Sequence, residues 1–376
     1  MSLGVEIAAP PTSPPPASAA GRSVAEIVAR DLAPLARAID EDGLYPEAVM
    51  RALGAAGAYA HHTGAHPAGG LVAAVADMAT VGTACGSTAF CTWCQDALAW
   101  YLARSENPAP RQNWLAAIAA GEKLGGTGLS NPMKTFSKLD RLAFSGVRVP
   151  GGWRVSGRLP WVSNLGPDHL FASVFAVGDG ADGGRRIMAV FDCAAEGVSL
   201  VEVGPFLALE GTRTYAVMLR DVFVPDDAVI TEDAVRFVPT IRQGFVLLQF
   251  GMALGTARAA AALMRKDTKL LGEKPVAVLP LDADAIEARA DALTERAAVL
   301  AASHEDPSRG AFIEVLKARL DGAWLALEAT QAAVLALGAR GYMRRSEVHR
   351  RQREAQFVAI VTPSVKHILT EISRGV

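Results

Sequence analysis

Residues 121–132 read GEKLGGTGLSNP, and residues 151–168 read GGWRVSGRLPWVSNLGPD. From residue 121 to 235, Gly, Pro, Asn and Ser separate short runs of β-branched and aromatic residues, such as Trp153–Val155 and His169–Val177. On both sides of this segment the sequence is rich in Ala, and its apolar residues recur at helical spacing. The pattern therefore predicts a β module between two helical segments.

We expect an α+β protein with four segments. They are a disordered lead, an N-terminal helical domain, a middle β domain of antiparallel strands, and a C-terminal helical bundle, over residues 1–22, 23–120, 121–235 and 236–376. The lead is rich in Pro, Ser and Ala and lacks the cationic start and apolar core of a targeting peptide.

Helix signals support these boundaries. Ser23 and Glu26 have the spacing of a capping box, which predicts a helix start. After residue 236, helical patterns run from Gln243 to Met264, from Asp282 to Ala302, from Ala311 to Leu337, and from Glu347 to the end. The second of these is expected to pack through Ala285, Ala288, Ala292 and Leu293.

Composition limits the classes of function. Hydrophobic residues make up 51% of the 376 and charged residues 20%, more apolar than a soluble domain needs. Charged residues interrupt every apolar run before about 18 residues, so no membrane span is expected. The surplus predicts subunit contacts, as in a homotetramer or homodimer. A net charge of -2 gives no basic surface for nucleic acid.

Four cysteines form no disulfide framework, which is typical of a cytoplasmic protein. Cys91 and Cys94 have redox-motif spacing, but they lie in a helical pattern, which favours a core or pocket lining over redox chemistry. His61 and His62 are expected in a solvated loop, and no metal site is predicted. Asp96 is read either as an exposed helix position or as a substrate-cavity carboxylate.

Several motifs resemble those of the acyl-CoA dehydrogenase superfamily of flavoproteins. They are Leu129-Ser130-Asn131-Pro132, Gly152–Gly157 with Trp161-Val162-Ser163-Asn164, Glu210–Arg213 with Val222–Pro225, and Gly338–Tyr342. The resemblance covers about residues 23–374. It implies an N-terminal helical domain, a middle β-barrel and a C-terminal four-helix bundle that forms a tetramer core.

The resemblance also implies a flavin, FAD by default. Its expected contacts are Leu129, Ser130, Trp161, Val162, Ser163, Gly338 and Ser364. Ser130 and the Leu129 backbone would bond the pyrimidine edge, Trp161 would cover the ring, and Ser163 would address N5, which suits a flavin's need for polar contacts and an apolar surface. Leu271 and Leu335 stand where the family has an Arg and a Gln that contact FAD, so FMN stays possible.

The family's catalytic base is missing from its place. Thr362 aligns with the Glu that removes the substrate's α-proton, and a hydroxyl cannot do that work. Asp96 or Glu354 could take over. Pro363 is typical of the superfamily's monooxygenase branch, yet that branch's histidines are replaced by Val361 and, earlier in the chain, by Gln95.

Three functions follow from the resemblance. The first is a flavin-dependent oxidoreductase that oxidises a CH–CH bond of an acyl-CoA or similar substrate and passes electrons to an acceptor such as an electron-transfer flavoprotein. The second is a two-component monooxygenase, supplied by a flavin reductase, that acts on an aromatic or natural-product substrate. The third is a non-catalytic subunit that pairs with an active homologue.

Overall fold

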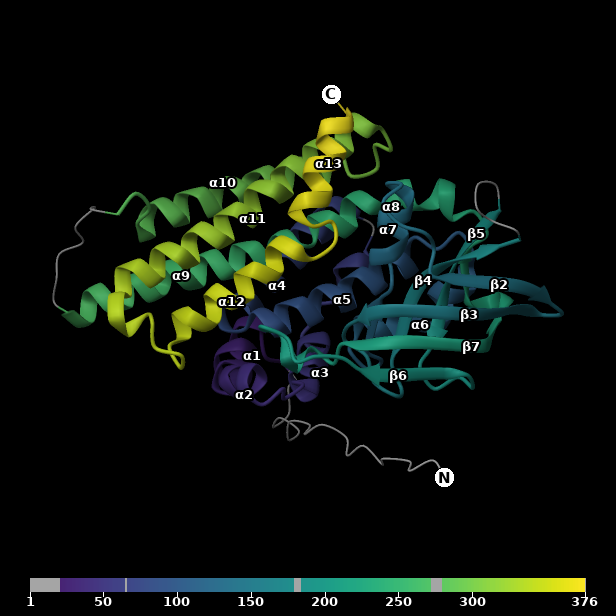
Figure 1. The fold of residues 1–376 in the computed structure, drawn as a ribbon, viewed down its shortest axis with the longest axis horizontal. Helices are drawn as coiled ribbons and strands as arrows, with labels where there is room; N and C mark the ends of the chain where they lie inside the picture. Colours follow the sequence, from purple (N-terminus) through teal and green to yellow (C-terminus); the bar gives the residue numbers. More distant parts are fainter. Residues whose placement is uncertain (1–20, 65, 179–183, 272–278, 376) are drawn as a thin grey trace.

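The computed structural model describes residues 21–64, 66–178, 184–271 and 279–375, so most of the expected lead lies outside the described residues. Helices fill one side of the molecule and a twisted sheet the other (Figure 1). The helices before the sheet are α1 Val24–Ile27, α2 Ala36–Glu41, α3 Glu47–Ala55, α4 Pro67–Ala84, α5 Gly86–Ala103 and α6 Pro108–Ala119. The predicted capping box is confirmed, because Ser23 Oγ accepts the Glu26 N–H and the Glu26 carboxylate accepts the Ser23 N–H.

The sheet occupies the middle of the chain. Its strands are β1 Gly125–Thr127, β2 Phe144–Val149, β3 Gly152–Val162, β4 Leu170–Val177, β5 Arg185–Asp192, β6 Val198–Glu202, β7 Tyr215–Pro225 and β8 Val229–Thr231. The order is β6-β7-β3-β2-β4-β5-β8, with β1 beside β4. The expectation of purely antiparallel strands was wrong, because β4 pairs parallel with both β1 and β2. A short helix, α7 Ser130–Phe136, follows β1.

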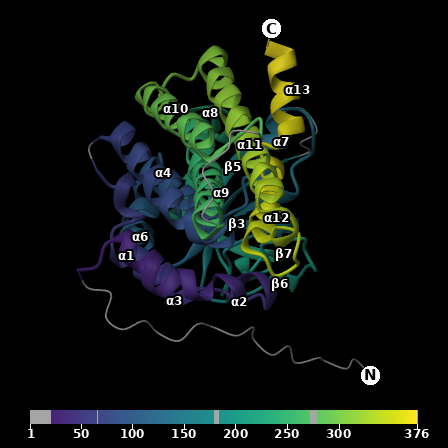
Figure 2. The ribbon, with the colours of Figure 1, turned by 90° about the vertical axis from the view of Figure 1, so that its left-hand side faces the viewer.

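The C-terminal helices form one packed group. They are α8 Ala234–Leu247, α9 Phe250–Leu271, α10 Ala283–Ala302, α11 Arg309–Leu337, α12 Glu347–Ile360 and α13 Val365–Gly375. Seen from the side, α9 runs through the middle and contacts α4, α10, α11 and α12 (Figure 2). The sheet and the two flanking groups of helices confirm the predicted α+β class.

The contact face of α10 differs from the expected one. Its buried residues are Ile286, Ala290, Leu293, Ala297 and Ala301. Ala288 and Ala292 are exposed, so of the predicted face only Leu293 is buried. The alanines occur on every side of this helix, and the larger Ile286 and Leu293 decide which side packs because they bury more apolar area.

Two helical stretches, Ala234–Leu270 and Arg309–Arg340, are long and apolar enough to cross a membrane by length and composition. The fold buries 83% of the apolar window of the first and 44% of that of the second. Core packing within the chain therefore accounts for much of the apolar surplus in the first stretch.

A buried pair of amides joins the N-terminal helices to the sheet. Gln95 on α5 donates to the carbonyls of Ile118 and Lys123, both at 2.9 Å, and its oxygen accepts the Gly125 N–H at 2.9 Å. Asn164, just after β3, donates to the Gly125 carbonyl at 2.7 Å. Both amides are fully buried, so β1 is held between α5 and the end of β3.

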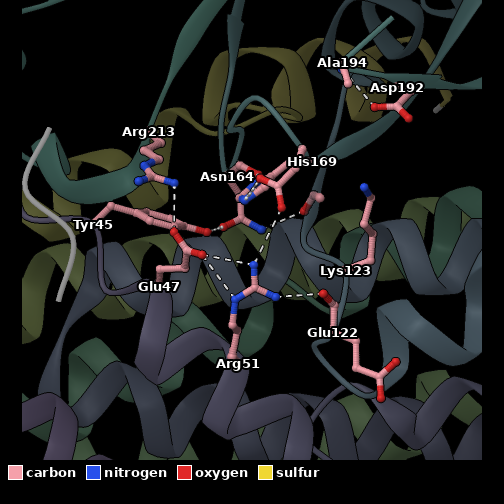
Figure 3. Close-up of polar contacts among 12 residues, drawn as sticks. Tyr45, Glu47, Arg51, Glu122, Lys123, Asn164, His169, Asp192, Ala194 and Arg213 are labelled. Atoms are coloured by element: carbon pink, nitrogen blue, oxygen red, sulfur yellow. Dashed lines mark hydrogen bonds and ion pairs between the residues drawn. The ribbon is translucent and has the colours of Figure 1, made fainter. Parts of the chain in front are cut away.

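Asn164 is fixed from the opposite side by side chains that Figure 3 shows around it. Tyr45 Oη donates to Asn164 Oδ1 at 2.7 Å, and His169 Nδ1 donates to the Asn164 carbonyl at 3.0 Å. The Arg213 guanidinium lies 4.3 Å from the Tyr45 ring centre and pairs with Glu47 at 3.2 Å. Asn164 has a φ of 61°, a conformation that Asn tolerates better than most residues.

We expect Gln95→Leu to destabilise the protein by about 3–5 kcal/mol, because two carbonyls and one N–H would be buried without partners. The midpoint of urea unfolding measures this loss. Gln331→Leu, the same change at an exposed position of α11, should cost within about 0.5 kcal/mol. Equal midpoints for the two variants would show that the Gln95 amide is not needed to hold β1.

Candidate functional site

A cavity of about 460 Å³ lies where α5, α7, β3 and α12 meet the segment 206–214. Part of its apolar wall is formed by Phe90 and Trp93 of α5 and Phe357 of α12. The Phe90 and Phe357 rings pack edge to face, with 4.5 Å between their ring centres. Trp161 of β3 also lines the cavity and is 62% exposed, so its indole is available to a ligand. The volume lies in the range of small-molecule sites.

Two groups of hydroxyls line the same cavity. Ser130 Oγ and Thr362 Oγ1 are 2.6 Å apart, and these two oxygens have two protons between them. One proton forms the bond within the pair, so the other remains for a ligand. In the second group, Ser163 Oγ lies 2.6 Å from Thr214 Oγ1, which lies 2.8 Å from Thr212 Oγ1.

The predicted flavin contacts divide into two sets. Ser130, Trp161 and Ser163 line the cavity, as does Thr362. Leu129 and Val162 are buried beside them, and the Leu129 N–H already bonds Thr127 Oγ1 at 3.2 Å. The structure does not bring the remaining two to this cavity: Gly338 ends α11, and Ser364 Oγ accepts the His367 N–H at the start of α13.

A buried cation holds the Thr362 segment in place. Gln249, between α8 and α9, donates to the Thr362 carbonyl at 2.8 Å and accepts from Arg319 Nε at 2.7 Å. Arg319 also donates to the Val358 carbonyl at the end of α12. Burial lowers the pKa of Arg319 to about 10, and in the described chain neutral oxygens are its only acceptors. These bonds fix the wall of the cavity that contains Thr362.

Asp96 is on another side of α5. Its carboxylate lies 3.1 Å from His62 Nε2, and both side chains are fully buried, so the expected exposure of Asp96 and the expected solvated loop at His62 were wrong. His61 pairs with Asp77 at 2.7 Å. Burial raises the pKa of Asp96, although His62 opposes the shift. The cavity-lining residues of α5 are Phe90, Trp93 and Cys94, and Asp96 is not among them in the described chain.

Glu354 is bound as a structural anion. Arg350 contacts one of its oxygens at 2.7 Å and Arg351 the other at 3.1 Å. Burial would raise the pKa of Glu354, but the two arginines and the Gly86 N–H outweigh it and hold the pKa below its usual value. A carboxylate that is saturated with donors is a poor proton acceptor, so the idea that Glu354 replaces the missing base is not supported.

The titratable groups in the cavity wall are Lys134, Arg353 and Cys94. Within the described chain, no Asp, Glu or His belongs to this wall. Arg353 is engaged by a two-pronged ion pair with Asp40. Burial raises the pKa of the Cys94 thiol well above its usual value, so the thiol stays protonated. Cys94 lines the cavity, which agrees with the predicted core or pocket-lining position.

Sequence reasoning missed several of these residues. Thr212 and Thr214 lie in the Glu210–Arg213 motif or beside it, and that motif was named for its resemblance, with no role given to its hydroxyls. Gln249 and Arg319 are polar residues inside apolar helical runs, which is the signal that could have identified them. Lys134 carried no signal, because a lysine on a short helix is usually solvated.

Comparison with known proteins finds several that this chain is similar to. The family model described as "Acyl-CoA dehydrogenase, N-terminal domain" matches residues 17–122. The short-chain-specific acyl-CoA dehydrogenase of Clostridium acetobutylicum is 24% identical over 357 residues, which cover 90% of this chain and 91% of that protein.

Solved structures share the whole fold. Butyryl-CoA dehydrogenase from Megasphaera elsdenii aligns with a TM-score of 0.81 at 17% identity, over 94% of this chain and 95% of that one. KijD3, solved in complex with FMN and dTDP-3-amino-2,3,6-trideoxy-4-keto-3-methyl-D-glucose, aligns with a TM-score of 0.77 at 19% identity, over 94% and 91%.

We expect Gln249→Glu to loosen the cavity wall while preserving stability. The new carboxylate would pair with Arg319 but would have no N–H for the Thr362 carbonyl. Hydrogen exchange of residues 357–366 should therefore quicken, while the melting temperature stays within about 3 °C of the wild type. Gln331→Glu on the surface of α11 is the matched control.

Gln249→Leu removes both bonds of Gln249, whereas Gln249→Glu removes only the bond to the Thr362 carbonyl. Comparing the two variants therefore separates the effects of the two bonds. Gln249→Leu should cost about 2–4 kcal/mol, since the Arg319 charge would lose an acceptor inside the protein. Unchanged exchange of residues 357–366 in Gln249→Glu would mean that another contact fixes the Thr362 segment.

Proposed function

Because the chain belongs to the acyl-CoA dehydrogenase superfamily of flavin-dependent oxidoreductases, we propose that it binds a flavin beside a small substrate. We further propose that its reaction is a monooxygenation with reduced flavin and oxygen. A reduced flavin supplies two electrons to O2, one oxygen atom enters the substrate, and the other leaves as water.

The cavity wall carries this proposal. Oxidation of an acyl thioester begins with removal of the α-proton, which needs a base whose pKa lies near neutrality. In the described chain the wall offers hydroxyls, a protonated thiol and two cations. Of the two candidate bases, Asp96 lies away from the wall against His62, and Glu354 is held between two arginines. Oxygen transfer to a substrate does not require a carboxylate at this position.

The donor set fits a flavin. Trp161 gives an exposed aromatic face, and the Ser130–Thr362 pair has one proton for an acceptor on the pyrimidine edge. FMN is favoured over FAD, because Leu271 and Leu335 replace residues that contact the additional nucleotide in the family. KijD3, whose solved structure contains FMN, lends support to this choice.

Lys134 points to the charge of the ligand. It lies four residues after Ser130 on α7, so both side chains share the face of the helix that lines the cavity. Within the described residues no acceptor is bonded to its ammonium group, whereas Arg353 is neutralised by Asp40. Burial lowers the pKa of His367; the Glu371 carboxylate opposes this shift, and the Lys134 charge adds to it. We propose that a carboxylate or phosphate of the ligand pairs with Lys134.

A second candidate is the oxidation of a CH–CH bond of an acyl-CoA, with an electron-transfer flavoprotein as acceptor. The similarity to the Clostridium acetobutylicum acyl-CoA dehydrogenase, which aligns over 90% of this chain, favours this reaction. This reaction would need a base that the substrate, the solvent or a second subunit brings to the cavity.

A homo-oligomer is a further proposal. Large apolar side chains remain exposed at the end of α11 and in the turn before α12, with Leu335 at 58%, Tyr342 at 82% and Met343 at 66%. Trp324, also on α11, is 44% exposed. Surfaces of this kind commonly become buried between subunits.

The two candidate reactions are separated by restoring the base. We expect the flavin-loaded wild type to keep the visible absorbance of its flavin when butyryl-CoA is added without oxygen. In Thr362→Glu the flavin absorbance should fall at least about tenfold faster, because a general base contributes factors of this size or more. Thr362→Gln has the same size without a base and should behave as the wild type. Bleaching of the wild type would favour dehydrogenation, and a wild type that binds no flavin would favour a non-catalytic subunit.

Lys134→Met tests the proposed anion contact. In the flavin-loaded protein we expect benzoate to bind about tenfold more weakly while benzamide, its neutral counterpart, is unaffected, because a charge-assisted bond is lost. Lys134→Arg should restore most of the affinity, and Lys366→Met, at an exposed position of α13, should change nothing.

The source of the anion is distinguished by comparing riboflavin with FMN. If the flavin phosphate is the partner of Lys134, Lys134→Met should weaken FMN but not riboflavin, and benzoate should be unaffected. Unchanged binding of both benzoate and FMN would overturn the assignment of Lys134.

A further inference from the structure

The hydroxyls of Ser163, Thr214 and Thr212 form a hydrogen-bonded chain whose direction is fixed. A carbonyl oxygen can only accept, so Thr212 must donate to the Leu209 carbonyl, 2.7 Å away. This uses the single proton of Thr212, and its 2.8 Å bond to Thr214 therefore requires Thr214 to donate. The Thr214 proton is then used as well, so Ser163 must donate in the 2.6 Å bond between them.

The end of this chain faces the cavity as an acceptor. The proton of Ser163 points to Thr214, and its remaining lone pairs are left for a ligand, since no donor among the described residues is bonded to Ser163 Oγ. The Ser130–Thr362 pair differs, because it keeps one proton that it can donate. The two hydroxyl groups in the cavity wall thus make different demands on a ligand: one can donate, and Ser163 can only accept.

The backbone around the chain keeps this direction. The Asn164 N–H donates to the Thr212 carbonyl at 2.9 Å, and the Leu165 N–H donates to the Arg213 carbonyl at 3.3 Å. Thr212 is almost fully buried, and Leu209, whose carbonyl accepts the Thr212 proton, has a left-handed φ of 70°. To reverse the chain, Thr212 would have to leave this carbonyl without its partner, which is unfavourable inside the protein.

We propose that Ser163, oriented by Thr214 and Thr212, makes the cavity select the reduced form of the flavin. This rests on the proposed function. N5 of an oxidised flavin offers only a lone pair, which would face the lone pair of Ser163, whereas N5 of the reduced form carries a hydrogen that Ser163 can accept. Ser163 is the contact, and the two threonines are positioning residues that act through it.

Selection of this kind fits a protein that receives its flavin already reduced. A protein that binds one redox form of a flavin more tightly shifts the reduction potential of the bound flavin. The size of the shift is set by the ratio of the two dissociation constants. For a two-electron couple, a tenfold preference for the reduced form raises the potential by about 30 mV.

The test is the ratio of the dissociation constants of oxidised and reduced FMN, measured by fluorescence titration, the reduced form being kept with dithionite under nitrogen. We expect the wild type to bind reduced FMN at least about tenfold more tightly than oxidised FMN, because one state makes a hydrogen bond and the other meets a repulsion. Thr214→Val should free the Ser163 proton for donation to oxidised N5 and so lower the ratio at least about fivefold. Thr212→Val should act in the same direction.

Two further variants complete the experiment. Ser163→Ala should bring the ratio close to one. Thr330→Val, which removes another buried hydroxyl within α11, should leave the ratio unchanged, and thermal unfolding checks that each variant is folded. A wild-type ratio near one, or variants that keep the wild-type ratio, would overturn the selection by Ser163 and leave flavin binding intact. Binding of neither form would overturn the proposed function together with this inference.

Discussion

The buried amides of Gln95 and Asn164 are the constraint on which the cavity depends. They join α5, β1 and the end of β3 through hydrogen bonds to backbone groups, so the end of β3 cannot move relative to the helices without leaving these groups unpaired. Asn164 directly follows Ser163, and Trp161 lies two residues before Ser163. Two buried amides that do not themselves line the cavity thereby set the position of an aromatic surface and a hydroxyl that do.

The distribution of charge explains why this cavity differs chemically from that of a base-dependent dehydrogenase. The carboxylates near it are bound elsewhere: Asp40 holds Arg353, Glu354 is held between Arg350 and Arg351, and Asp96 faces His62. Each of these contacts stabilises the helical scaffold. Among the described residues, the polar groups that the wall leaves for a ligand are the Lys134 ammonium group, the hydroxyls and the Cys94 thiol, which suit anionic and polar groups and are poorly suited to removing a carbon-bound proton.

Much of the architecture could be predicted from the sequence, because turn residues and apolar periodicity are local signals. The β module, its flanking helices and the capping box at Ser23 belong to this group. Ser130, Trp161 and Ser163, which line the cavity, were named only through the family resemblance. The parallel pairing of β4, the buried face of α10 and the His62–Asp96 pair do not, since each depends on partners distant in sequence. The polarity of Gln249 and Arg319 within apolar helical runs is visible in the sequence, but their partners across the bundle are not, for the same reason.

Hydroxyl groups usually give a binding site flexibility, because each can either donate or accept. In this cavity the chain ending at Leu209 removes that freedom from Ser163, while the Ser130–Thr362 pair keeps it. The same residue types therefore play unequal roles, and the difference arises from one backbone carbonyl that can only accept. If the proposed flavin binds here, a cavity without a free carboxylate would act on the redox reaction through the protonation state of the flavin, and not through removal of a substrate proton.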